Sequence, residues 1–375
     1  MSMLTGARVV SAAGVINDGF VEIEDGRIVA VGSGAAVARV ATDITDLDGG
    51  WLLPGFIDLH MHGGGGHDVT TSATAAAAAV EFHRAHGTTR TLVSLMAQHV
   101  DAMGEQLGWL AALARAGDIA GVHLEGPFLS AAQCGAQRPE NLLMPDVAVL
   151  RALLAAGQGS VRTVTIAPEL PGALELIRDL VAAGVVAAVG HTAATFDQAT
   201  AGFQAGATLA THLFNAMGAF DHRAPGPAIA ALDAGAFVEV INDGAHLHDA
   251  LVRLAARTAA QSLVLVTDAI STTGVGDGNY RLGGQFVQVM NGEARTTSGH
   301  RAGSALTMDA AVRRAVLAVG LPIELAAAAA STTPARVLGL QDRCGAIAAG
   351  LAADLVVLDD DLRVQRVMVG GGWIR

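Results

Sequence analysis

Runs of β-branched and other apolar residues alternate with alanine- and leucine-rich stretches of helical periodicity through most of the chain. This alternation is typical of repeated βα units, which build a parallel sheet covered by helices. The eight apolar runs are Phe56 to His62, Thr88 to Leu95, Ala120 to Glu125, Val161 to Ala167, Val185 to His191, Ala207 to His212, Phe237 to Asn242 and Leu263 to Asp268. The pattern predicts an α/β fold with a (β/α)8 TIM barrel, whose active site lies at the carboxyl ends of the strands.

The two ends of the chain show short apolar segments broken by turns instead. The expected strands are Ala7 to Ile16, Gly19 to Glu24, Arg27 to Val31, Asp354 to Leu358 and Arg363 to Val369, with turns at 17–19 and 24–26. Neither end has enough apolar residues to fold alone. We therefore expect residues 1–53 and 345–375 to form one small β-sandwich domain, and residues 54–344 to form the barrel, with a hairpin inserted from Tyr280 to Thr297.

Composition narrows the class of protein further. Hydrophobic residues make up 51% of the chain, yet the longest uncharged stretch, residues 198–220, carries polar side chains that are costly in lipid. A net charge of −12 argues against sequence-independent nucleic-acid binding. Two cysteines and the lack of a leader-like apolar segment predict a cytoplasmic protein. All 23 basic residues are arginines, so the chemistry uses no lysine.

Metal-ligand and acid–base residue types gather at the ends of the predicted strands. They are His60 and His62 on the first run, Glu125 on the third, His191 on the fifth, His212 on the sixth and Asp268 on the eighth. Residues i and i+2 of a strand share a face, so both histidines of the first run point into the barrel. A single histidine at such a place is usually a packed core residue. Burying all six groups together is costly unless a cation pairs with them, so the set predicts a metal site.

Zinc suits imidazole and carboxylate ligands, and a catalytic site leaves one position open for water. We expect Asp268 to act as general base towards that water and then as general acid towards the leaving amine. The alternatives for Asp268 are a helix N-cap or another metal ligand.

The motifs around these residues resemble a known family. Residues 54–62 (Pro-Gly-Phe-Ile-Asp-Leu-His-Met-His) look like the opening of the amidohydrolase superfamily barrel. Narrower motifs, in order along the chain, resemble the N-acetylglucosamine-6-phosphate deacetylase family. They are residues 123–128 (His-Leu-Glu-Gly-Pro-Phe), 190–192 (Gly-His-Thr), 211–217 (Thr-His-Leu-Phe-Asn-Ala-Met), 243–246 (Asp-Gly-Ala-His), 266–269 (Val-Thr-Asp-Ala) and 302–308 (Ala-Gly-Ser-Ala-Leu-Thr-Met).

The resemblance implies a metal-dependent deacetylation of N-acetylglucosamine 6-phosphate to glucosamine 6-phosphate and acetate, a reaction of amino-sugar catabolism and cell-wall sugar recycling. It places metal ligands at Glu125, His191 and His212 and the catalytic aspartate at Asp268. The implied substrate contacts are Ala136, Asn215, Ala216, Arg223, His246, Arg301, Ala302 and Gly303. Arg223 and His246 are the phosphate partners that it implies, presented across a homodimer interface. Taken alone, Arg223 is an ordinary exposed arginine of a Pro/Gly loop.

Three positions leave alternatives open. Gln137 stands where many family members have histidine, so it is counted as a substrate contact that cannot become cationic. Cys134, in the same loop, is interpreted as a bystander, with a redox-sensitive thiol as the alternative. The pair His60 and His62 predicts a second metal that shares Glu125, so one or two ions per subunit are expected; the alternative is that the pair hydrogen-bonds substrate or water around a single ion.

Two rival functions remain. Another amidohydrolase acting on a different N-acyl amino sugar phosphate or an N-acyl amino acid would keep the metal residues and change the Arg223 and His246 region. A catalytically inactive scaffold on the same barrel is the other rival, although no ligand position is lost here.

Overall fold

The structure is a computed structural model that describes residues 1–34, 43–282, 285–290, 292–297 and 299–374. It divides into two compact units. The first contains Met1–Asp58, His83–Arg90 and Thr307–Arg375, and the second contains Leu59–Phe82 and Thr91–Leu306. The domain boundaries expected from the sequence, after residues 53 and 344, stay a prediction.

Eight parallel strands form the barrel sheet, in the order β15-β14-β13-β12-β11-β10-β9-β6. They are β6 (Phe56–Met61), β9 (Thr88–Met96), β10 (Gly121–Glu125), β11 (Val161–Ile166), β12 (Val186–Val189), β13 (Leu209–Ala210), β14 (Phe237–Ile241) and β15 (Leu263–Val266). A parallel bridge between Met61 and Ala269 links the first strand to the chain that follows the last. The predicted (β/α)8 fold is confirmed, and each strand matches one of the eight apolar runs.

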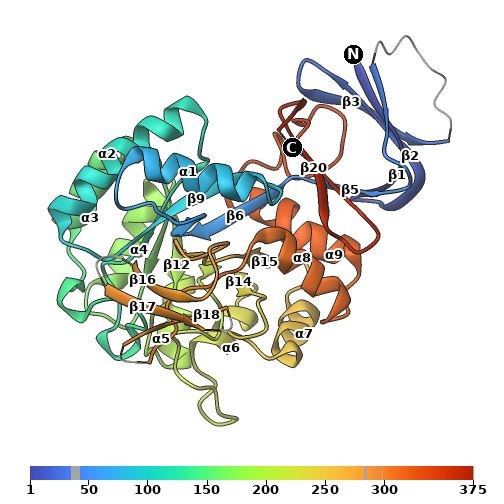
Figure 1. The fold of residues 1–375 in the computed structure, drawn as a ribbon. Coiled ribbons are helices and arrows are strands. Elements are labelled where there is room, and N and C mark those ends of the chain that lie inside the picture. Colours follow the sequence, from blue (N-terminus) through green and yellow to red (C-terminus); the bar gives the residue numbers. More distant parts are fainter. Residues whose placement is uncertain (35–42, 283–284, 291, 298, 375) are drawn as a thin grey trace. The chain divides into compact units, whose positions relative to one another are not determined.

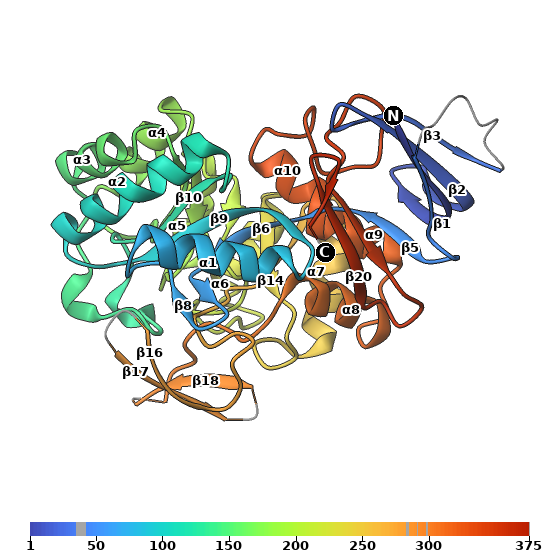
Figure 2. The same cartoon turned by 45° about the horizontal axis from the view of Figure 1, so that its top comes forward.

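Helices follow the strands and lie outside them, as α2 and α3 do in both views (Figures 1 and 2). They are α1 (Ala73–Arg84), α2 (Val100–Ala116), α3 (Val147–Gly157), α4 (Ala173–Ala182), α5 (Phe196–Gln204), α6 (Gly226–Asp233) and α7 (Asp249–Thr258), then α8 (Met308–Leu317), α9 (Ile323–Ala327) and α10 (Thr333–Val337). Asp146 caps α3, and Thr195 with Gln198 forms a capping box on α5. Of the helices in the described ranges, none has the length and apolar character that a membrane span needs.

A large apolar core in the second unit holds the barrel strands against their helices. Fully buried residues such as Val93, Leu124 and Val164 on strands meet Leu107 and Ile177 on helices. Burying a side chain of this kind stabilises the fold by about 1.5–3 kcal/mol. The core fixes the strands, and therefore fixes the positions of the side chains at their carboxyl ends.

The predicted inserted hairpin is a three-stranded antiparallel sheet, set apart from the barrel strands in Figure 2. Its strands are β16 (Gly278–Leu282), β17 (Gln285–Met290) and β18 (Glu293–Thr296); residues 283–284 and 291 of the predicted segment lie outside the described residues. Buried Val287 and Val289 pack in one cluster with Ile270 and Ala302. A short two-stranded ribbon, β7 (Gly63–Gly64) with β8 (His67–Asp68), follows the first barrel strand.

In the first unit, strands from both ends of the chain share one sheet, in the order β21-β20-β19-β5-β1-β2-β3, with β4 beside β1 (Figure 1). The strands are β1 (Ser2–Ser11), β2 (Gly14–Glu24), β3 (Arg27–Ser33), β4 (Asp43–Asp46), β5 (Trp51–Pro54), β19 (Leu355–Leu358), β20 (Val364–Val369) and β21 (Gly372–Trp373). The turn expected at residues 17–19 was wrong. These residues lie inside β2, where the pairing with β1 is irregular and Asp18 has a positive φ of 47°, so a bulge takes up the turn-forming residues. The chain turns at Ala12 and Ala13 instead.

Candidate active site

All six predicted metal and acid–base residues lie at the carboxyl end of the barrel strands. His60 is in β6 and Glu125 ends β10, whereas His191, His212 and Asp268 each follow their strand by two residues. These last three have φ angles of 44°, 31° and 49°. This left-handed region is unfavourable for residues with a Cβ atom, and such strain concentrates at functional sites. The sharp bend after each strand turns the side chain back over the barrel mouth.

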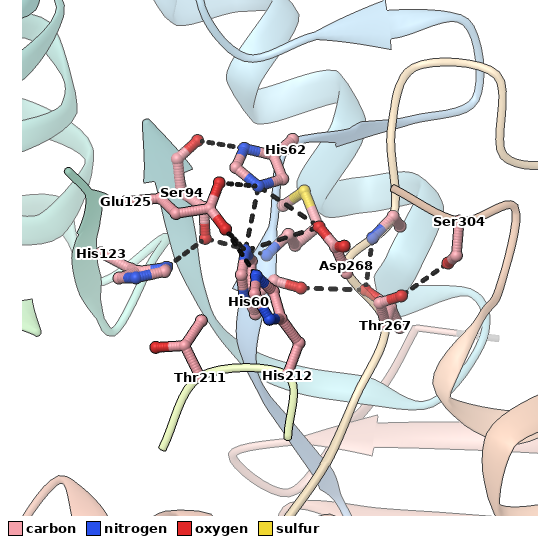
Figure 3. A network of polar contacts seen from close by, with 12 residues as sticks. His60, His62, Ser94, His123, Glu125, Thr211, His212, Thr267, Asp268 and Ser304 are labelled. Atoms are coloured by element: carbon pink, nitrogen blue, oxygen red, sulfur yellow. Dashed lines mark hydrogen bonds and ion pairs between the residues drawn. The ribbon is translucent and has the colours of Figure 1, made fainter. Parts of the chain in front are cut away.

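Among the described residues, two buried groups of three have the geometry for binding metal ions. One is His60, His62 and Asp268, and the other is Glu125, His191 and His212; within each group the ligand atoms lie within 4.8 Å of one another. The Glu125 carboxylate belongs to the second group and also contacts the first, and Figure 3 shows it beside His60 and His62. Its Oε1 is 3.1 Å from Nε2 of His191 and of His212 and 3.4 Å from Nε2 of His60, and its Oε2 is 3.4 Å from Nε2 of His62.

Hydrogen bonds outside the groups fix which nitrogen of the His62 and His191 rings faces inward. Nδ1 of His62 donates to the Ser94 carbonyl at 3.1 Å, and Nδ1 of His191 donates to the Gln133 carbonyl at 2.9 Å. Each ring therefore presents the lone pair of Nε2 to the group. The tautomers follow from these acceptors.

The inward-facing nitrogens approach one another closely. Nε2 of His60 and His62 are 3.0 Å apart, and Nε2 of His191 and His212 are 3.1 Å apart. Two lone pairs at such a distance repel unless a proton or a cation lies between them. The residues present therefore fit a divalent cation that accepts imidazole and carboxylate ligands.

The charges in the site shift the pKa values strongly. Burial by itself lowers the pKa of His62, but hydrogen bonds to Asp268 and Glu125 raise it to about 9. Burial raises the pKa of Asp268, yet the neighbouring His60 and His62 hold it below its usual value. Asp268 is consequently a carboxylate that can accept a proton at neutral pH.

A cavity of about 450 Å³ opens above the two groups, and its lining includes most of the predicted substrate contacts: Ala136, Gln137, Asn215, Ala216, His246, Arg301 and Gly303, besides His62, Glu125, His191, His212 and Asp268. His60 and Ala302 are fully buried. Arg223 is exposed and is not part of the lining formed by the described residues.

Gln137 contacts one candidate metal ligand, Glu125, directly. Its side-chain NH2 group donates to Oε2 of Glu125 at 2.6 Å, and its carbonyl oxygen accepts from the backbone N–H of Ala97 at 2.9 Å. Cys134 lines the cavity nearby as a free, partly buried thiol. The substrate contact predicted for Gln137 stays a prediction, and its hydrogen bond to Glu125 was not foreseen.

His246 is held at the cavity by Asp243. Nδ1 of His246 donates to Oδ2 of Asp243 at 2.7 Å, and the backbone N–H groups of Ala245 and His246 both donate to Oδ1 at 2.8 Å. One carboxylate therefore fixes both the loop and the imidazole ring, and leaves Nε2 of His246 for another partner.

Two buried residues beside the candidate metal ligand His60 were missed. Burial lowers the pKa of His123, on β10, well below its usual value. Its Nδ1 lies 3.0 Å from Oγ of Ser94, and its Nε2 lies 2.8 Å from Oγ1 of Thr165. Glu239 on β14 lies 3.3 Å from Nδ1 of His60. A carboxylate inside an apolar run, as in residues 237–241, was the signal that could have revealed Glu239.

The barrel, the two ligand groups and the carboxylate beside them define a hydrolase of the metal-assisted type, and comparison with known proteins agrees. The amidohydrolase family model matches residues 51–374, so the chain belongs to the amidohydrolase family.

Within that family, the chain is similar to deacetylases of phosphorylated acetamido sugars. The structure of a mutant N-acetyl-D-glucosamine-6-phosphate deacetylase from Mycobacterium smegmatis, in complex with N-acetyl-D-glucosamine-6-phosphate, is 45% identical with a TM-score of 0.95, covering 99% of this chain and 98% of that one. The human N-acetylglucosamine-6-phosphate deacetylase is 38% identical over 89% of this chain and 85% of its own length. The N-acetylgalactosamine-6-phosphate deacetylase of Escherichia coli is 36% identical over 98% of both chains.

Proposed function

We propose that this protein is a metal-dependent hydrolase that deacetylates N-acetylglucosamine 6-phosphate, giving glucosamine 6-phosphate and acetate. The observation that carries the proposal is the pair of buried imidazole and carboxylate groups at the base of the cavity. The relatives support the substrate, because the human and Mycobacterium smegmatis proteins are N-acetylglucosamine-6-phosphate deacetylases.

We assign zinc as the metal, since four imidazole nitrogens and two carboxylates are ligands that zinc accepts. Glu125, His191 and His212 would hold one ion; His60 and His62, with Asp268 or Glu125, would hold a second. When bound, the cation would polarise the acetyl carbonyl and make water ionise near neutral pH.

Asp268 performs the proton transfers in this proposal. Its carboxylate, like that of an ordinary aspartate, is ionised at neutral pH and takes a proton from the attacking water. As the C–N bond breaks, Asp268 returns that proton to the nitrogen, which leaves as the amine of glucosamine 6-phosphate. The Oδ1 atom lies 3.4 Å from Nε2 of His62, so the same carboxylate can also contact a metal ion.

The phosphate is assigned to Arg223, whose guanidinium donates N–H groups to its oxygens, and to His246, whose Nε2 donates to a phosphate oxygen in the imidazolium form. His246 lines the cavity, whereas Arg223 lies on an exposed loop beside Phe220, a large apolar side chain that is 51% exposed. We therefore assign this loop to a homodimer interface that brings Arg223 to the partner's site. Zinc, the dimer and a cytoplasmic location are parts of the proposal.

Turnover of four sugars tests the function: N-acetylglucosamine 6-phosphate, N-acetylgalactosamine 6-phosphate and the unphosphorylated form of each. Zinc-loaded protein should act fastest on N-acetylglucosamine 6-phosphate, and the unphosphorylated sugars should be poor substrates. No release of acetate from any of them would reject the proposal.

A second candidate substrate is N-acetylgalactosamine 6-phosphate, because the Escherichia coli relative that matches 98% of this chain is a deacetylase of that sugar. The two sugars differ only in the configuration at C4. A higher kcat/KM for the galactosamine sugar would replace the first candidate with the second and leave the metal site and Asp268 unchanged.

A further inference from the structure

Glu239 is a buried carboxylate, with 2% of its surface exposed, in the middle of the apolar strand β14. A carboxylate in such surroundings is expensive unless strong hydrogen bonds compensate for the lost solvation. Its partners are therefore informative. Two N–H groups reach the same oxygen, Oε2, and they come from residues of different ligand groups.

The first partner is the ring of His60. Nδ1 of His60 lies 3.3 Å from Oε2 of Glu239, while Nε2 of the same ring faces His62, Glu125 and Asp268 at 3.0 to 3.5 Å. A carboxylate can only accept a hydrogen bond here, so the proton lies on Nδ1 and the lone pair of Nε2 faces the ligand group. A carboxylate behind a metal-binding histidine orients the ring and raises the basicity of its free nitrogen.

The second partner is the backbone of His212. The N–H of His212 donates to Oε2 of Glu239 at 3.2 Å, and the N–H of Leu213 donates to the Glu239 carbonyl at 2.8 Å. His212 has a φ of 31°, a strained conformation that persists only where neighbours hold it. Its Nδ1 is buried with no hydrogen-bond partner among the described residues, so no bond from that atom orients the ring. Glu239 therefore fixes the bend that carries the His212 side chain.

We propose that Glu239 is a positioning residue that couples the two candidate metal positions, by orienting the His60 ring for one ion and the His212 backbone for the other. The proposal rests on the proposed metal-dependent function. It predicts that loss of the Glu239 carboxylate weakens zinc binding at both positions, although Glu239 itself binds no metal.

Three substitutions separate the contributions of Glu239. Glu239→Gln keeps an acceptor oxygen and removes the charge, whereas Glu239→Leu removes both hydrogen bonds at similar volume. His60→Ala empties one position and leaves the bond between Glu239 and His212 intact. Asp354→Asn is the matched control, because Asp354 is buried to 4% exposure but bonds to Arg90 and to the N–H of Gly370.

Zinc affinity is measured by chelator competition on folded, metal-stripped protein, with circular dichroism and Tm to confirm folding. A visible spectrum of the Co²⁺-loaded protein reports the geometry of the ligands. Glu239→Leu should weaken zinc binding roughly 10- to 100-fold at both positions and alter the cobalt spectrum. Glu239→Gln should keep most of the zinc affinity that Glu239→Leu loses. His60→Ala should lose one zinc and retain the affinity of the other, and Asp354→Asn should match the unmodified protein.

Unchanged zinc affinities and an unchanged cobalt spectrum in folded Glu239→Leu would overturn the proposal while leaving the deacetylase function intact. An effect confined to one zinc would overturn the coupling. If Glu239→Leu does not fold, Glu239→Gln decides: zinc binding weakened by a few-fold at an unchanged Tm supports the positioning role, and unchanged binding rejects it. Unmodified protein that binds no zinc and releases no acetate would overturn both this inference and the proposed function.

Discussion

The side-chain amide of Gln137 donates to the carboxylate of Glu125 at 2.6 Å, on the oxygen that faces His62 rather than on the one that faces His191 and His212. The other end of the amide accepts from the backbone N–H of Ala97, so the orientation of Gln137 is fixed on both sides. Gln137 therefore holds the Glu125 carboxylate where it contacts histidines of both ligand groups.

Substitutions at Gln137 should weaken metal binding more than they weaken substrate binding. Gln137→Leu removes one hydrogen bond to a charged group, worth about 1.5–3 kcal/mol, and should lower kcat roughly tenfold or more with weaker zinc retention. Gln137→Glu places a second carboxylate beside Glu125 and should be worse, because like charges at this distance repel. Zinc content and steady-state kinetics measure both effects. A rise in KM alone, with normal zinc content, would show that Gln137 contacts the substrate rather than supporting the metal ligand.

The proton-transfer role of Asp268 predicts a separation between metal content and turnover. Asp268→Asn keeps an oxygen that can contact a metal ion but cannot accept a proton at neutral pH. We expect it to retain zinc while kcat falls by roughly 10² or more. Elemental analysis and acetate release on the same preparation test this. Zinc loss in parallel with activity would reassign Asp268 as mainly a ligand of the His60 and His62 group.

The two ligand groups predict two zinc ions per chain. Protein loaded with excess zinc and then desalted should contain about two ions, and a His60→Ala, His62→Ala variant should contain about one. The carboxylate of Glu125 contacts histidines of both groups and would hold both ions in this hypothesis. A ratio near one in the unmodified protein, unchanged by the double substitution, would reject the second ion and leave the deacetylase proposal standing.

Phosphate recognition predicts losses that depend on the substrate. Arg223→Ala and His246→Ala should each lower kcat/KM for N-acetylglucosamine 6-phosphate, by a factor that corresponds to about 2–4 kcal/mol of transition-state stabilisation. The kcat/KM for the unphosphorylated sugar should change little. Equal losses on both sugars would remove the residue concerned from phosphate binding.

If Arg223 acts on the partner's site, mixing the Arg223→Ala protein with the Asp268→Asn protein should restore activity. In a dimer of Arg223→Ala with Asp268→Asn, one site keeps its own Asp268 and receives Arg223 from the other chain. Mixed and re-equilibrated protein should recover up to about a quarter of normal activity, since half the dimers are mixed and each has one intact site. Activity no higher than the average of the two variants would place Arg223 in its own chain's site or outside phosphate binding.

Asp243 predicts a pH dependence of stability that is separate from the metal residues. Burial raises the pKa of Asp243, but hydrogen bonds from His246 and the loop N–H groups lower it below its usual value of 3.8. The folded state therefore binds this proton less readily than the unfolded state. The stabilisation is complete above the unfolded pKa and is lost as the pH falls through the lower, folded pKa.

Metal-free Asp243→Asn should accordingly be less stable than the unmodified metal-free protein by roughly 1–3 kcal/mol at pH 7. The difference should shrink below about pH 3.8, the ordinary value for this carboxyl. Urea unfolding of both proteins across this range measures it. A difference that stays constant into acid would show that the carboxylate charge of Asp243 does not stabilise the loop.

The sequence alone determined the eight strands and the six side chains at their ends. Apolar runs of strand length identify buried strands, and a parallel barrel places every strand's carboxyl end on one face. His60 and Asp268, 208 positions apart, could therefore be placed at the same end of the barrel from the sequence alone. Residue spacing also predicted that His60 and His62 share one face, because side chains alternate along a strand.

Only the tertiary structure decided which atoms meet. The bond from Gln137 to Glu125 and the double contact of Glu239 with His60 and His212 join different strands and loops, and they depend on side-chain rotamers and on the strained bends after the strands. The bulge at Asp18 likewise follows from pairing with β1, which turn-forming residues do not reveal locally. Local patterns specify elements because periodicity and burial act along the chain, whereas hydrogen bonds between distant side chains exist only once packing has set their distance.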